Sequence, residues 1–138
     1  MLLFYADSTR IFRMELQILP GKVGWPMRYP NDISTFVVKK ARARSLAVDA
    51  VTRKVLWNDR VRGTFYRCNF DGSGTEELFR FTIFAQVNGL IVDPISGQLY
   101  LTLNDVVLRS DMSGKNIKIV HTERYSNPFR LALSYDNE

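Results

Sequence analysis

Short runs of alternating apolar and polar residues dominate this chain, and segments rich in glycine, aspartate and proline separate them. Four consecutive runs are clearest, over residues 46–49, 54–59, 64–70 and about 75–81. Because successive side chains of a β-strand point to opposite faces of a sheet, these runs predict four strands. No segment shows the period of an amphipathic helix, so the pattern predicts an all-β fold.

The pattern repeats roughly every 42 residues, a length typical of one four-stranded blade of a β-propeller. Leu46–Asp49 returns as Leu90–Asp93 and, in degraded form, as Leu131–Ser134. Further markers recur in the same order: Lys54–Asp59 with Gln98–Leu103, Arg67 with Arg109, and Gly72 with Gly114. Several markers in one order at one period predict consecutive blades.

The repeat divides residues 1–138 into the blades of one partial propeller. We expect blade one over residues 1–38, blade two over 45–81, blade three over 89–121, and the first strand of a further blade over 130–136. In blade one, three prolines and two glycines within residues 17–32 predict a long ordered loop before a fourth strand at 33–38. In blade three we expect strands over 90–93, 98–103, 106–112 and 116–121.

The repeated residues resemble the LDL-receptor class B repeat, also called the YWTD repeat. Leu46–Asp49 and Val55–Asp59 match its first two strands, and Phe65–Ser73 matches its third strand and the following turn. In blade three, Leu101 and Leu103 replace the Trp and Asp of the name motif. The resemblance implies a partial six-bladed YWTD-type β-propeller, with about three blades of four antiparallel strands each, which is half of the ring.

The motif residues of such a repeat are expected to build the framework. The large aromatic side chain fills the wedge between two blades, and the aspartate carboxylate accepts hydrogen bonds from nearby backbone N–H groups. By this resemblance, the structural positions are Tyr5, Asp7, Asp49, Trp57, Asp59, Asp93 and Tyr100.

The net charge is +5, and the basic residues are unevenly placed. In a propeller, the connections between strands two and three share one face with those between strand four and the next strand one. That face would collect nine basic residues: Arg10, Lys39, Lys40, Arg42, Arg44, Arg60, Arg62, Arg124 and Arg130. It is either a solvated charged face or a docking face for a protein ligand with an acidic surface or a sulfated glycan. Nucleic acid is disfavoured, because the aromatic residues are expected to be committed to blade packing.

The sequence carries no motif of a catalytic or metal-binding site. The single cysteine, Cys68, and the single histidine, His121, each lie in a predicted strand, so we expect no metal and no cofactor. Lactonase-like and strictosidine-synthase-like hydrolases share the propeller architecture and use acidic or metal-binding residues around the central channel. There this chain supplies only Asp49 and Asp93, so the sequence favours a binding module over an enzyme.

The resemblance implies a non-enzymatic, extracellular ligand-binding module of an LDL-receptor-related receptor, serving endocytosis of lipoprotein or protein ligands or acting as a Wnt co-receptor. Such a module belongs to the ectodomain of a single-pass membrane protein with flanking EGF-like modules, whose signal peptide and anchor would lie outside these residues. A nidogen-like basement-membrane protein is the second hypothesis, and a hydrolase is the third. Because a half-ring leaves two blade faces open, we expect either a longer chain or a homodimer that completes the propeller.

Overall fold

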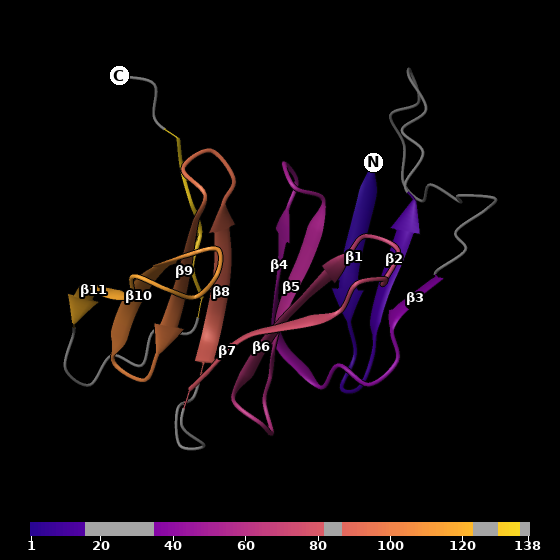
Figure 1. Cartoon of the computed structure of the whole chain (residues 1–138), viewed down its shortest axis with the longest axis horizontal. Helices are drawn as coiled ribbons and strands as arrows, with labels where there is room; N and C mark the ends of the chain where they lie inside the picture. The colour runs from indigo at the N-terminus through magenta and orange to yellow at the C-terminus, as the bar shows by residue number, and fades with distance from the viewer. Residues whose placement is uncertain (16–34, 82–86, 123–129, 136–138) are drawn as a thin grey trace, which may run out of the picture.

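The structure is a computed structural model that describes residues 1–15, 35–81, 87–122 and 130–135. These residues form three antiparallel β-sheets placed one after another like the blades of a propeller (Figure 1). All regular secondary structure in the described residues is β, so the predicted all-β class is confirmed. The predicted loop over 17–32 lies outside the described residues.

Each sheet contains strands that are consecutive in the chain and paired in order. Blade one contains β1 (Leu2–Ala6), β2 (Ile11–Glu15) and β3 (Thr35–Val38). Blade two contains β4 (Ala43–Asp49), β5 (Lys54–Asp59), β6 (Thr64–Asn69) and β7 (Glu76–Arg80). Blade three contains β8 (Val87–Asp93), β9 (Gln98–Leu103), β10 (Val106–Asp111) and β11 (Lys118–Thr122). The first strands of blades two and three, β4 and β8, lie side by side.

The strands differ from the sequence expectations mainly at their ends. β4 and β8 begin earlier than expected, because each continues across a β-bulge before its main ladder. The bulge of β4 is stabilised by Asn58, whose side-chain oxygen accepts hydrogen bonds from the Ser45 backbone N–H (2.9 Å) and hydroxyl (2.7 Å). β11 begins later than expected, because Asn116 has a φ of 53°, which lies outside the strand region.

Residues 130–135 do not form the predicted first strand of a further blade. In blades two and three the first strand pairs with the second strand of its own sheet, and no such partner follows within the described residues. The segment is instead held near β8, because the Tyr135 hydroxyl donates a hydrogen bond of 2.8 Å to the Asp93 carboxylate.

Aspartate side chains fix the turns that follow several strands. After β5, one Asp59 oxygen accepts the backbone N–H groups of Val61 (2.8 Å) and Arg62 (3.0 Å). Asp49 binds the turn after β4 in the same way, and Asp93 binds the turn after β8. Because each carboxylate replaces missing backbone partners in a tight turn, these residues are part of the framework.

One apolar cluster fills the interface between blades one and two. Ile11 of β2 packs there with Val55, Trp57 and Cys68, all of which are buried. The Trp57 ring is only 2% exposed and stacks on Tyr66, with 5.6 Å between the ring centroids. This single indole therefore fills much of the wedge between the two sheets.

A second apolar cluster fills the interface between blades two and three. Leu56 and Phe65 of blade two contact Leu99, Leu101 and Leu108 of blade three. Since Leu56 lies between Val55 and Trp57 in β5, blade two uses alternate side chains of one strand to pack against both neighbours.

The two end faces of the array expose apolar side chains. On blade one, Tyr5 stacks on Phe12 at 4.9 Å and Phe12 lies 5.0 Å from Phe36, whose side chain is 51% exposed. On blade three, every residue of β11 is exposed, including Ile119 and Val120. Exposed apolar side chains of this kind are available for contact with another surface.

Candidate binding face and central groove

The connections that carry the predicted basic residues lie together on one face. The backbone N–H of Ala41, between β3 and β4, donates to the carbonyl of Thr9 in the β1–β2 turn (2.8 Å). The N–H of Arg60, in the β5–β6 turn, donates to the carbonyl of Arg42 (3.2 Å). Two backbone hydrogen bonds thus join three connections, which Figure 1 shows along the lower side of blades one and two.

The structure separates the nine basic residues into groups. Lys39, Lys40, Arg42, Arg60 and Arg62 are exposed on the three joined connections. Arg44 and Arg130 line a groove described below. Arg10 is engaged in an ion pair. Arg124 lies outside the described residues.

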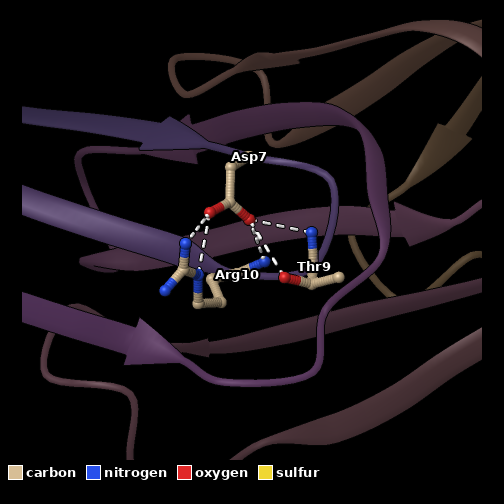
Figure 2. A network of polar contacts seen from close by, with 3 residues as sticks. All are labelled: Asp7, Thr9 and Arg10. Atoms are coloured by element: carbon tan, nitrogen blue, oxygen red, sulfur yellow. Dashed lines mark hydrogen bonds and ion pairs between the residues drawn. The ribbon is translucent and has the colours of Figure 1, made fainter.

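Arg10 is held by Asp7 within the β1–β2 turn (Figure 2). One oxygen of Asp7 pairs with the Arg10 guanidinium at 2.5 and 2.8 Å, and the other accepts the backbone N–H groups of Thr9 and Arg10 at 2.8 and 2.7 Å. The guanidinium also lies over the Phe12 and Phe36 rings, 5.1 and 5.5 Å from their centroids. Arg10 therefore organises the turn and the exposed aromatic stack.

Protonation of Asp7 is expected to weaken this turn in acid. The side-chain hydrogen bond from Arg10, followed by the backbone bond from Thr9, lowers the pKa of Asp7 from 3.8 to about 2. Because folding lowers this pKa, the stabilisation is present above about pH 4 and is lost as the pH falls through about 2. An NMR titration of the Asp7 carboxyl carbon should give a midpoint near 2. A midpoint near 3.8 would show that the ion pair does not form in solution.

A groove of about 480 Å³ opens between the first strands of successive blades. The groove is lined by Arg44 of β4, Asn88 of β8 and Arg130 of the last described segment, and Arg44 and Asn88 occupy equivalent positions of the repeat. An Arg44 guanidinium nitrogen donates to the Asn88 side-chain oxygen at 2.8 Å. Leu46, Leu90 and Leu131 supply the apolar part of the lining. The lining of the groove thus combines two arginines with three leucines.

The sequence reasoning missed Asn88 and the groove itself. Arg44 and Arg130 were predicted as members of a charged face, but their convergence depends on how β8 lies between them. The repeat held part of the signal, because aligning the first strands places Asn88 at the position of Arg44, two residues before the matched leucine. Comparing that position across the blades would have pointed to Arg44 and Asn88, but not to Arg130, which directly precedes its leucine.

The predicted framework residues occupy different environments. Asp49, Trp57 and Asp59 are buried, with exposed fractions of 2–3%. Tyr5 lies on the open face of blade one, and Asp93 is bound by its own turn and by Tyr135. Tyr100 of β9 is half-buried.

Two observations bear on metal binding and nucleophilic chemistry in the described residues. No three His, Cys, Asp or Glu side chains among them gather into a set that could hold a metal ion. Burial raises the pKa of the Cys68 thiol to about 11, so this side chain stays protonated at neutral pH and is a poor nucleophile. In the described part of the chain there is also no helix that is long and apolar enough to cross a membrane.

Comparison with known proteins identifies the architecture. No protein-family model matches the sequence, and no curated protein matches it. Solved structures do match, among them the crystal structure of a nidogen/laminin complex, with a TM-score of 0.54 and 17% sequence identity. The match covers 94% of this chain and 64% of that chain, so the present chain spans less than two thirds of the length of its neighbour.

The likeness establishes the fold. The chain is a partial β-propeller, as its sequence repeat predicted.

Proposed function

We propose that this chain is a non-enzymatic, protein-binding part of an extracellular β-propeller. The observation that carries the proposal is the groove lined by Arg44, Asn88 and Arg130, whose described lining contains no carboxylate. Planar guanidinium groups form paired hydrogen bonds with carboxylates, and they do so best where the site is partly shielded from water. The ligand class that fits is an acidic protein segment whose Asp or Glu side chain enters the groove.

A hydrolase is the less favoured alternative, because the candidate acids are used elsewhere. Asp49 and Asp93 lie at the C-terminal ends of β4 and β8, whereas the groove lies near the N-terminal ends of the same strands. Both carboxylates accept backbone N–H groups of their own turns. A general acid or base must reach the substrate, and these two groups are committed to holding the fold.

The proposed setting is the ectodomain of an LDL-receptor-related, single-pass membrane receptor with flanking EGF-like modules, acting in ligand uptake or as a Wnt co-receptor. Support comes from the YWTD-like residues and from the propeller fold. The neighbouring structure is a complex of nidogen with laminin, which supports a nidogen-like matrix protein as the second setting. A membrane span in the same transcript would separate the two settings.

Charge reversal in the groove is expected to weaken the binding of acidic ligands at least tenfold. The variant Arg44→Glu/Arg130→Glu should bind a fluorescein-labelled Asp-Gly repeat peptide at least tenfold more weakly than the unaltered chain, because two charge-assisted contacts become repulsive. The matched control is Lys115→Glu/Lys118→Glu on blade three, which changes the net charge equally away from the groove. Fluorescence anisotropy at two salt concentrations measures both affinity and salt dependence. Equal affinities of the two variants would refute the groove as the ligand site.

A homodimer that completes the ring is supported by the repeat geometry. Tyr5 occupies the position in blade one that Trp57 occupies in blade two, and Trp57 is buried against the preceding blade. Among the described residues no blade precedes blade one, so its Tyr5 face corresponds to the face that blade two packs against a preceding blade. We propose that blade three of a second copy packs against the Tyr5 face. Analytical ultracentrifugation of the preparations used for the peptide titration should give the mass of a dimer. The mass of a monomer would refute the homodimer.

A further inference from the structure

A second groove, of about 330 Å³, lies at the junction of blades one and two. It is lined by Arg13, Thr52, Arg53, Asn69, Phe70 and Asp71. Thr52 and Arg53 belong to the β4–β5 turn, Asn69 ends β6, and Phe70 and Asp71 belong to the β6–β7 turn. In an antiparallel sheet these turns lie at the opposite end of the strands from the β5–β6 turn. The second groove is therefore separate from the face that carries Arg44 and Arg130.

Arg53 is held in place on one wall of this second groove. Its backbone has a φ of 56°, the left-handed conformation that closes the tight turn before β5. Its guanidinium lies over the Phe70 ring, with 5.1 Å to the centroid. Phe70 is itself packed against Phe4 of blade one at 4.7 Å. A cation stacked on a ring that is fixed between two blades presents its N–H groups in a defined direction.

Arg13 comes from the other wall, on β2 of blade one. The nearest acid in the lining is Asp71, whose carboxylate accepts the backbone N–H and the hydroxyl of Ser73 at 2.9 and 2.6 Å. Those bonds from Ser73 are the main cause of its lowered pKa, and the charge of Arg13 adds to them. Asp71 is thus committed to its own turn and neutralises the two guanidinium groups only in part.

Neighbouring charges leave the second groove positive. Lys54 donates from its ammonium to the Asn69 side-chain oxygen at 2.5 Å, next to the lining. Another nearby acid, Glu76, is paired with Arg67 at 2.5 Å. The described surroundings of the groove therefore hold three cations, Arg13, Arg53 and Lys54. Two carboxylates there form no ion pair: Asp71, and Asp49, which is buried and accepts the Thr52 hydroxyl. An excess of positive charge around a small opening attracts anions.

We propose that this second groove binds sulfate groups of a sulfated glycan. A sulfate has three terminal oxygens and a permanent charge, so it can accept N–H groups from two guanidiniums that approach from different blades. The rim adds groups suited to sugar hydroxyls, namely the Asn69 amide and the Thr52 hydroxyl, which is anchored by its bond to Asp49. The proposal does not depend on the protein-binding role of the first groove.

The test uses a size-defined heparin oligosaccharide and the same oligosaccharide after chemical desulfation. Isothermal titration of the full chain should show binding of the sulfated form only. Arg13→Ala/Arg53→Ala should weaken that binding at least tenfold, because two charge-assisted contacts are lost. Arg60→Ala/Arg62→Ala removes the same charge from the opposite face and should change the affinity less than twofold.

Further variants separate binding from folding. Arg53→Lys keeps the charge but loses the planar fork, so it should weaken binding of the sulfated form while leaving the thermal midpoint within a few degrees of the unaltered chain. Equal losses of affinity for the sulfated oligosaccharide in the Arg13→Ala/Arg53→Ala and Arg60→Ala/Arg62→Ala variants would overturn the proposal. Such a result would mean that net charge alone attracts the oligosaccharide. Binding of the desulfated form, or preferred binding of the Asp-Gly peptide at this groove, would overturn it as well. The Arg44→Glu/Arg130→Glu variant should still bind the oligosaccharide, so failure of the first groove leaves this test intact.

Discussion

Replacing Trp57 with alanine is expected to lower the free energy of unfolding by about 3–5 kcal/mol, the range observed when large aromatic side chains are truncated in protein cores. The indole is 2% exposed and lies between blades one and two with Ile11, Val55 and Cys68. Its removal leaves a cavity that the sheets cannot close, because each blade is tied to its own hydrogen-bonded ladder. The stacking on Tyr66 at 5.6 Å is lost at the same time.

Urea denaturation followed by circular dichroism measures the effect of Trp57→Ala. Ile95→Ala is the control, because Ile95 is 79% exposed in a turn and its truncation should cost less than about 0.5 kcal/mol. The loss of unfolding free energy for Trp57→Phe should lie between those of Trp57→Ala and Ile95→Ala, because the phenyl ring still fills part of the wedge between the blades. A Trp57→Ala variant as stable as the control would show that the interface between blades one and two does not form in solution.

The sequence repeat predicted the fold because a blade is a local unit. Each strand pairs with its neighbour in sequence, so turn residues and alternation suffice to place the ladders. The ends of strands were predicted less well, since they depend on side chains from other strands. The bulge at the start of β4 is fixed by Asn58 of β5, and no pattern within β4 indicates it. The order of the blades, by contrast, follows from the period alone.

The candidate sites could be predicted only in part, for the same reason. The strand connectivity was enough to place Lys39, Lys40 and Arg60 on one face. It did not show that Asp7 engages Arg10, because that contact depends on the conformation of the β1–β2 turn. It also gave no sign that Arg13 of blade one and Arg53 of blade two line a common groove. Contacts between blades depend on how the sheets are rotated, which the repeat leaves open.

Packing between blades also explains why glycine recurs in the turn after the third strand. A β-carbon on Gly72 would lie 2.0 Å from the backbone oxygen of Val37 in β3, and one on Gly114 would lie 1.8 Å from the Phe79 ring in β7. Val37 and Phe79 both lie in the outermost strand of the blade that precedes the glycine. Each later blade thus presses its turn against the outer strand of the blade before it, and only glycine leaves room for that approach.

Gly72→Ala is therefore expected to destabilise the chain by about 2–5 kcal/mol. The left-handed φ of +88° costs about 1–2 kcal/mol for any residue with a β-carbon, and the overlap with Val37 adds about 1–3 kcal/mol of overpacking. The obstacle is a backbone atom, so no change of rotamer relieves it. Gly97→Ala is the matched control, because Gly97 has a φ of +65° and no heavy atom within 4 Å of an added β-carbon. The control should show only the conformational cost.

A second pair of variants tests the cause of this difference. At Gly114 the obstacle is the Phe79 side chain, so adding Phe79→Ala to Gly114→Ala should remove the overlap and make the combined loss smaller than the sum of the two single losses. At Gly72 the obstacle is the carbonyl of Val37, so Val37→Ala should give no such relief. Chemical denaturation of the six variants measures both couplings. Additive losses at Gly114, or equal losses for Gly72→Ala and Gly97→Ala, would mean that the blades do not approach as closely as the structure shows. The glycine whose variants depart from these expectations would then identify which of the two blade interfaces is more loosely packed.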